Sequence, residues 1–353
     1  MRCPVVPRRL GAGVTGYGGS MLSPDMDHSP RFTLRSSTFA GTLLATLLLL
    51  AMLAPAAHAV RPGTWEVREP APMARHEASY VRIGDQFHLI GGKRKQHHVY
   101  DADSDSWSKA APLLPKVNRV QAVTVGGKIY VLGGTVKWRE PTIESKAVRI
   151  YDPATNTWSK GAPMPRPRGA GGVAVYQGRI YYAGGISDGR AVKWFDVYTP
   201  AKNSWRRLPN MPVRRQHFQA VVLGGNFYAI GGADYSTRKL VKRNDRFNFE
   251  KRAWRGKSLR RPPVVTEGFA AAKLGGRVVL FGGVNANGAT RLVQAYNPSS
   301  NRWTRWARML SPRHAFGAAT CAGGVYVAAG SDKKGRHPTP KNEVFFLDTP
   351  QPC

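Results

Sequence analysis

Short apolar segments recur along the chain, and each stops at a pair of small residues. Each segment is a run of apolar residues followed directly by glycine, which is typical of a short buried strand. The six copies are FHLIGG ending at Gly92, IYVLGG at Gly134, IYYAGG at Gly185, FYAIGG at Gly232, VVLFGG at Gly283 and VYVAAG at Gly330. The sequence therefore predicts a chain built from one repeated β-unit.

Tryptophan recurs in step with these segments, at intervals of 42 to 51 residues. Its positions are Trp65, Trp107, Trp158, Trp205, Trp254 and Trp303. An aromatic residue stands seven positions before five of them, at Tyr100, Tyr151, Tyr198, Phe247 and Tyr296. A period of roughly 40–50 residues with four short strands in each unit indicates a β-propeller.

One unit shows how the four strands are expected to run. RVQAVTV forms the first strand, Gly126 and Gly127 make a tight turn, and KIYVLGG returns. KAVRIYD forms the third strand, Asp152-Pro153 begins a turn, and Trp158 opens the fourth strand. We interpret the glycines and tryptophans as scaffold: glycine permits close backbone approach where the blades converge.

The combined motifs resemble Kelch repeats. Five units carry an apolar strand and Gly-Gly, followed by a Tyr-Asp-Pro-like turn and tryptophan, and two of them add Met-Pro at Met164 and Met211. Aspartate, which WD-type repeats require, follows none of the six tryptophans. The resemblance covers residues 63 to 348 and implies an all-β, six-bladed Kelch-type β-propeller. It implies little about activity, because function depends on the sites that a fold carries.

The two ends of the repeat array predict how the propeller closes. The last unit contains AFGAATC, VYVAAG and EVFFLD but no tryptophan strand, while TWEVRE from Thr64 precedes the first unit. We expect the N-terminal strand to complete the last blade, since an open sheet edge is a liability.

The first 59 residues carry the pattern of a secretory signal peptide with an extended n-region. FAGTLLATLLLLAML at 39–53 is too short and wrongly flanked for a membrane span, and Ala57-His58-Ala59 fits a cleavage site. We therefore expect cleavage after Ala59, a single propeller domain at 60–353, a secreted or periplasmic location and no transmembrane span after processing. Cys321 and Cys353 would remain, either as a disulfide or as a buried thiol and a free tail.

The net charge of +32 is far from neutral and favours anionic partners. An acidic polysaccharide, an anionic envelope component or a protein partner fits a secreted chain, and a general compositional bias is the alternative. No groove-reading motif or single-strand stacking platform is present, and secretion argues against nucleic acid as the working partner.

The topology places two groups of loops at one mouth of the central channel. Sixteen residues before each glycine pair stand Arg75, Val117, Arg168, Arg215, Thr266 and Arg313. Arginine there also matches the Kelch pattern, so a structural salt bridge is the alternative to ligand binding. The next two positions vary more, and the polar residues there are His76, Glu77, Asn118, Arg119, Gln216, His217, Glu267 and His314. The second group of loops comes directly after the glycine pairs. Its polar residues are Lys93-Arg94-Lys95, Lys137, Asp188, Asp234-Tyr235, Asn285 and Asp332-Lys333-Lys334.

These residues lead to three hypotheses for function. Arginine, histidine and amide groups around a pit suit a carboxylated or phosphorylated ligand, so a non-catalytic binding module is the first hypothesis. In size, blade count and signal, the chain is also similar to the periplasmic sialic-acid mutarotases. That resemblance implies a sugar mutarotase or epimerase of the N-acetylneuraminate type. Ring opening needs an acid and a base near the anomeric centre, and the candidates are Glu267 or Glu77 with His217 or His314. No motif fixes that assignment.

A copper radical oxidase of the galactose oxidase type is the third hypothesis, and the sequence argues against it. That family needs a cysteine crosslinked to tyrosine, whereas Cys321 falls in a blade strand and Cys353 is the last residue. We expect no cofactor and no metal site; His97-His98 is a weak signal because adjacent side chains on a strand point apart.

Overall fold

The computed structural model describes residues 61–138, 142–335 and 337–349 of the chain. Residues Val60–Cys353 form one compact unit, and its described part is built from antiparallel strands with one short 3-10 turn, η1 at Pro200–Lys202. The predicted signal peptide and its cleavage after Ala59 lie outside the described residues.

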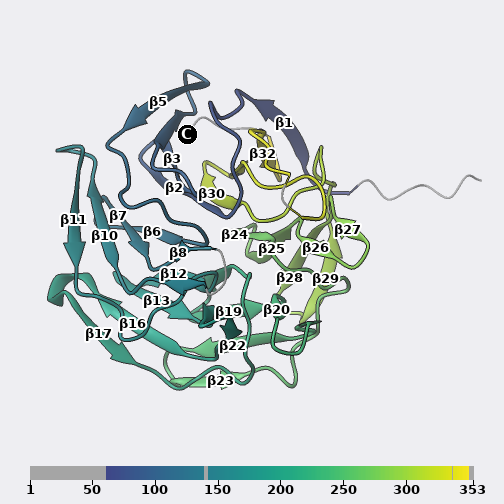
Figure 1. Cartoon of the computed structure of the whole chain (residues 1–353). Helices are drawn as coiled ribbons and strands as arrows, with labels where there is room; N and C mark the ends of the chain where they lie inside the picture. The colour runs from purple at the N-terminus through teal and green to yellow at the C-terminus, as the bar shows by residue number, and fades with distance from the viewer. Residues whose placement is uncertain (1–60, 139–141, 336, 350–353) are drawn as a thin grey trace, which may run out of the picture. The chain divides into compact units, whose positions relative to one another are not determined.

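Six four-stranded sheets make up the domain, and in each the strands follow one another as a meander. Figure 1 shows the sheets around a common centre, with the outermost strands β5, β11, β17, β23 and β29 at the periphery. The first three blades are β2 (Ala78–Ile83), β3 (Gln86–Gly91), β4 (His97–Asp101), β5 (Ser106–Ala110); β6 (Gln121–Val125), β7 (Lys128–Leu132), β10 (Val148–Asp152), β11 (Thr157–Gly161); and β12 (Gly172–Tyr176), β13 (Arg179–Ala183), β16 (Phe195–Thr199), β17 (Ser204–Arg207). The remaining blades are β18 (Ala220–Leu223), β19 (Asn226–Ile230), β22 (Asn244–Asn248), β23 (Ala253–Arg255); β24 (Ala270–Leu274), β25 (Arg277–Phe281), β28 (Val293–Asn297), β29 (Arg302–Arg305); and β30 (Gly317–Cys321), β31 (Gly324–Ala328), β32 (Asn342–Phe346), β1 (Thr64–Arg68).

Short two-stranded hairpins follow the second strand of four blades. They pair β8 (Thr135–Lys137) with β9 (Ile143–Glu144), β14 (Ile186–Ser187) with β15 (Arg190–Ala191), β20 (Ala233–Asp234) with β21 (Lys239–Leu240), and β26 (Val284–Asn285) with β27 (Gly288–Ala289).

The innermost strands close a ring. Contacts join β2 to β6, β6 to β12, β12 to β18, β18 to β24, β24 to β30, and β30 back to β2. The last blade is completed by the N-terminal strand, because β1 pairs antiparallel with β32 and Trp65 faces Phe345. The predicted six-bladed propeller and its closure by the N-terminal strand are confirmed.

The glycine pairs lie just beyond the second strands, where the blades come closest. In blade 2 the strand ends at Leu132, two residues earlier than the repeat suggests, because Gly133 and Gly134 both adopt positive φ (59° and 91°). A Cβ atom at Gly133 would stand 2.2 Å from the carbonyl oxygen of Arg168 in the next blade. Glycine is needed here for its conformation and for this close approach.

Tryptophan, tyrosine and asparagine tie neighbouring blades together at the outer edge. The Tyr198 hydroxyl donates to Asn203 Oδ1, Asn203 Oδ1 accepts the Ala162 N–H, and the Trp205 indole N–H donates to the Ala162 carbonyl. We call this four-residue network the rim latch. It recurs as Tyr100, Asp105, Glu69 and Trp107; as Tyr151, Asn156, Ala111 and Trp158; and as Tyr296, Asn301, Arg260 and Trp303.

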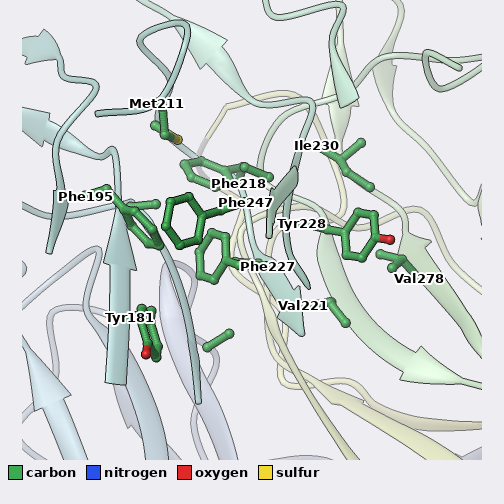
Figure 2. Packing of buried hydrophobic residues seen from close by; sticks show 14 of the residues in the cluster. Tyr181, Phe195, Met211, Phe218, Val221, Phe227, Tyr228, Ile230, Phe247 and Val278 are labelled. Atoms are coloured by element: carbon green, nitrogen blue, oxygen red, sulfur yellow. The ribbon is translucent and has the colours of Figure 1, made fainter. Parts of the chain in front are cut away.

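Aromatic side chains fill the space between blades. In the cluster shown in Figure 2, Phe195 lies 5.1 Å from Phe227 and 5.0 Å from Phe247, measured between ring centroids. Met211 and Phe218 also belong to the cluster, and both are buried. Phe195, Phe227 and Phe247 lie on β16, β19 and β22, and Met211 and Phe218 come from the segment between β17 and β18. Burial of their apolar surface therefore holds adjacent blades together.

Two further observations concern the ends and the membrane. Cys321 is disulfide-bonded, and since the sequence has only Cys3 and Cys353 besides it, the partner lies outside the described residues. The predicted bridge to Cys353 therefore stays a prediction.

In the described part of the chain, no helix is long and apolar enough to cross a membrane.

Candidate functional site

A ring of backbone hydrogen bonds, which we call the collar, narrows the central channel. Its six residues occupy equivalent positions before each first strand, and all have left-handed backbone with φ between 50° and 64°. Each N–H donates to the carbonyl of the collar residue in the preceding blade, over 2.6 to 3.1 Å, and the sixth bond closes the circle. The members are Glu77, Arg119, Ala170, His217, Gly268 and Ala315.

Three collar side chains form a charged cluster. Glu77 Oε1 lies 3.2 Å from Arg119 Nε and 3.2 Å from His217 Nε2, and Asn118 donates to the other carboxylate oxygen. Burial acts to raise the pKa of Glu77, but the hydrogen bond from His217 and the charge of Arg119 prevail and hold it well below its usual range. Glu77 is therefore a fixed anion that orients the Arg119 guanidinium and the His217 ring.

An open cavity of about 700 Å³ lies over the collar. Blades 4, 5 and 6 provide most of its wall, through hairpins β20–β21 and β26–β27 and the loop after β31. The Tyr235 ring stacks on His217 at 5.4 Å between centroids. Burial, together with a hydrogen bond to the Glu267 carboxylate, raises the pKa of Tyr235, so its hydroxyl stays protonated at neutral pH.

The cavity carries more positive than negative side chains. Arg119, Arg238, Lys239 and Lys334 line it, against the carboxylates of Glu77 and Glu267. Arg119 bonds Glu77 only through Nε, and its two terminal nitrogens have no hydrogen-bond partner in the described part of the chain. A guanidinium edge with free N–H groups, held in place by an ion pair, is suited to grip a carboxylate in two places.

The structure brings together five of the eleven residues predicted to bind ligand. His76, Arg119, His217, Glu267 and His314 line the cavity, together with the candidate catalytic residue Glu77. Of the residues after the glycines, Tyr235, Asn285 and Lys334 also line it. His314 Nε2 is 2.9 Å from the Lys333 carbonyl, which fixes the imidazole at the cavity edge.

Two polar candidates lie beneath the wall rather than in it. Asn118 is 2% exposed and bonded to Glu77, and Gln216 is fully buried. Asn118 positions Glu77, whereas the Gln216 side chain has no hydrogen-bond partner among the described residues.

The four predicted arginines Arg75, Arg168, Arg215 and Arg313 are buried inside the blades and are absent from the cavity lining. Arg168 pairs with Asp196 at 2.5 Å, Arg313 with Glu343 at 2.7 Å and Arg215 with Asp245. Arg75 instead contacts His98 Nδ1 at 2.7 Å and backbone carbonyls. The structure thus shows the salt-bridge alternative at three of these positions, and we leave all four out of the site.

Sequence reasoning missed Arg238 and Lys239. Both follow the glycine pair by several residues: Arg238 ends the turn that Asp234 begins by accepting the Ser236 N–H, and Lys239 opens β21. Because the four hairpins differ in length, a fixed offset from the glycine pair does not identify Arg238 and Lys239. The uninterrupted polar run STRK at 236–239, directly after Asp234-Tyr235, was the available signal.

The described residues contain no group of three or more histidine, cysteine, aspartate or glutamate side chains arranged to hold a metal ion. His97 and His98 point to opposite faces of β4, where His97 bonds His88 and His98 bonds Arg75.

Comparison with known proteins places this architecture in a family. The model of the KLHDC2/KLHL20/DRC7 Kelch-repeats domain matches residues 50–232, and the Kelch motif matches residues 266–310. The Kelch-like protein terF of Aspergillus terreus is 26% identical over 336 residues, which cover 86% of this chain and 73% of that protein. Kelch-like protein 36 of Mus musculus is 33% identical over 116 residues, covering 30% of this chain and 19% of that protein, so the match spans about a fifth of that relative.

A solved structure agrees with the fold. The structure of YjhT superimposes with a TM-score of 0.69 at 14% sequence identity, covering 78% of this chain and 96% of that one. At this identity the likeness concerns the fold alone. With one Kelch-repeat model covering half of its length and the Kelch motif found again near its end, the chain belongs to the Kelch-repeat family of β-propellers.

Proposed function

We propose that this protein is a secreted binding module that takes a carboxylated sugar in the cavity over the collar. As a Kelch propeller it is an interaction module, and the cavity gives that role a chemical preference. The observation that carries the proposal is Arg119: its Nε is anchored by Glu77, while both terminal nitrogens have no partner in the described part of the chain and the residue lines the cavity.

The surroundings of Arg119 fit a small anionic ring. Arg238, Lys239 and Lys334 add positive charge around the cavity, and Tyr235 adds an aromatic surface with a hydroxyl. An apolar wall with a few placed polar groups is the usual composition of a small-molecule site. A hexuronate or a sialic acid combines a carboxylate with a ring of this kind.

A secreted location is part of the proposal and has one supporting feature. Cys321 is disulfide-bonded, and disulfides persist mainly in oxidising compartments. The high positive charge then suits the anionic glycans of an envelope or cell surface.

Sugar mutarotation is the second candidate, favoured by the acid and base groups in the cavity. Ring opening needs a proton donor and an acceptor near the anomeric centre. Glu267 bonded to Tyr235 and His314 at the edge provide such groups. We expect Glu267→Gln to slow the interconversion of anomers, followed by NMR, by about 100-fold; a rate with wild-type protein equal to that of buffer would eliminate this candidate.

The binding proposal is tested by isothermal titration calorimetry of the purified protein. N-acetylneuraminate, galacturonate and glucuronate are compared with neutral galactose at low and high salt. We expect a carboxylated sugar to bind and galactose not to bind. Arg119→Lys, which keeps the charge beside Glu77 but loses the two-pronged grip, should weaken binding by about tenfold or more.

The matched control is Arg206→Lys on exposed strand β17, which should leave affinity unchanged. Equal affinity for galactose and galacturonate, or an unchanged affinity in Arg119→Lys, would overturn the proposal.

A further inference from the structure

A second basic cavity lies beside the first, on blade 3. It has a volume of about 460 Å³ and is formed by hairpin β14–β15, the segment leading into β16 and the loop before β18. Its polar and aromatic lining consists of Ser187, Asp188, Arg190, Lys193, Trp194 and Arg214. We call it the blade-3 pocket.

Three cations line this pocket without forming an ion pair in the described part of the chain. Arg190, Lys193 and Arg214 are exposed and make no ion pair with any described residue. Asp188 is the single carboxylate of the lining. Nearby arginines of the same blades behave differently, since Arg166 pairs with Asp196 and Arg243 with Asp245. The pocket is thus a concave site with excess positive charge that attracts anions.

Trp194 gives the pocket an ordered aromatic wall. The Arg166 guanidinium lies 4.1 Å from the centroid of the indole ring, and Arg166 is itself bound to Asp196. This chain of contacts fixes the orientation of Trp194, which is half-buried and part of the lining. An aromatic surface held in place beside unpaired cations can stack on a ring-shaped ligand while the cations bind its acid group. The pocket therefore fits an acidic sugar better than an inorganic anion.

The blade-3 pocket and the central cavity are neighbours. Strand β15, which carries Arg190, contacts β20, and hairpin β20–β21 is the wall that brings Tyr235, Arg238 and Lys239 into the central cavity. Arg214 precedes the collar residue His217 by three positions. Three residues of chain span at most about 11 Å, so a short oligomer reaches from one cavity to the other.

We propose that the ligand is an oligomeric acidic glycan, with one acidic sugar in the central cavity and a second in the blade-3 pocket against Arg190, Lys193, Trp194 and Arg214. This rests on the proposed function, because it extends the same site from one sugar to several. Occupying two linked sites raises affinity through effective concentration, without any change in the first site.

The test is calorimetric titration of the purified protein with mono-, di-, tetra- and hexagalacturonate at about 0.15 M salt, where diffuse attraction is screened. We expect the hexamer to bind at least about tenfold more tightly than the monomer. Lys193→Ala/Arg214→Ala should abolish this gain and leave monomer affinity unchanged. The control Lys160→Ala/Arg255→Ala removes the same side-chain types from exposed outer strands and should change hexamer affinity less than about twofold.

Each contrary result has a separate meaning. Monomer binding without a gain from length would overturn the oligomer proposal and leave the proposed function standing. Equal losses in the two double variants would show diffuse attraction instead of a pocket, and equal affinity for hexaglutamate would show an acidic peptide ligand instead of a glycan. Failure of the galacturonates, glucuronate and N-acetylneuraminate alike to bind, or binding insensitive to Arg119→Lys, would overturn the proposed function itself.

Discussion

The outer rim and the channel mouth use the same repeat in opposite ways. At the rim, four blades carry the same latch of tyrosine, asparagine or aspartate, a backbone peptide and tryptophan. At the mouth, the six equivalent collar positions share one backbone conformation but differ in side chain, from Gly268 and Ala315 to Glu77 and Arg119. The comparison teaches that repetition marks what holds the blades together, and divergence on a repeated backbone marks where a ligand can be recognised.

Blade 4 shows that the latch is lost as a unit. Phe247 replaces the tyrosine, and Arg252 replaces the asparagine at the same left-handed position. Pro209, which has no backbone N–H, replaces the residue that donates its N–H to the asparagine in the other latches. Only the tryptophan contact remains, from Trp254 to the Pro209 carbonyl at 2.8 Å. The hydroxyl and N–H donors and the amide acceptor are lost together, so no polar group of the latch is left without a hydrogen-bond partner.

The largest effect on stability is expected inside a blade, at a paired arginine. Asp245→Ala leaves the fully buried Arg215 guanidinium without its carboxylate, and burial already lowers the pKa of Arg215 to about 10. Chemical denaturation should show a loss of about 3–5 kcal/mol. The control Asp234→Ala, in an exposed hairpin turn, should cost far less; similar losses in both would refute the assignment of Arg215 to the scaffold.

Acid is expected to weaken blade 1 through its buried histidines. Burial lowers the pKa of His88 to about 4 and that of His97 to about 3, and the two rings bond each other at 2.8 Å. The unfolded chain takes up protons near the ordinary value of 6.5, so the free energy of unfolding should fall as pH drops below about 6.5, and the loss should end near pH 3–4.

The size of this acid effect should be on the order of a few kcal/mol. His88→Tyr/His97→Val introduces the residues that blade 2 has at the same places, Tyr130 and Val148. Denaturation between pH 7.5 and 4.5 should show a flatter dependence in this variant; an unchanged slope would mean that other groups control acid sensitivity.

Removing one rim latch should have a moderate effect. Asn203→Ala breaks the bonds from Tyr198 and from the Ala162 N–H and should cost about 1–2 kcal/mol in thermal or chemical unfolding. In blade 4, Phe247→Tyr/Arg252→Asn/Pro209→Ala should restore the latch and add about 1 kcal/mol. If the triple variant is no more stable than the double variant that keeps Pro209, the backbone N–H is not part of the latch.

The smallest effect on stability is expected at the mouth. Tyr235→Phe and Lys239→Ala alter exposed cavity walls and should change the free energy of unfolding by less than about 0.5 kcal/mol. Both should nevertheless weaken binding of a carboxylated sugar. A stability loss as large as that of Asn203→Ala would show that the mouth is part of the scaffold.

The sequence predicted the scaffold well because its determinants are local and repeated. Spacing alone placed the strands, the turn glycines and the closing strand at Thr64–Arg68. The site was predicted only in part. Counting from the glycines identified Arg119, His217 and Glu267, but it could not separate them from Arg75 or Arg215, because burial inside a blade depends on a partner from another strand, such as Asp245.

Arg238 and Lys239 escaped prediction for a related reason. The hairpins at this place differ in length from blade to blade, so residues of β20–β21 have no fixed offset from the repeat. The pocket around Trp194 likewise combines residues 187–194 with Arg214 from the loop before β18, and counting from the glycines does not show that these segments meet.

The most direct test of this account is hydrogen–deuterium exchange of the purified protein with and without saturating galacturonate. If the mouth is the site, protection should increase in the collar residues and in hairpin β20–β21, while the rim strands β5, β11 and β17 exchange as before. Protection confined to the rim, or spread evenly over all six blades, would contradict the division between a repeated scaffold and a single recognition site.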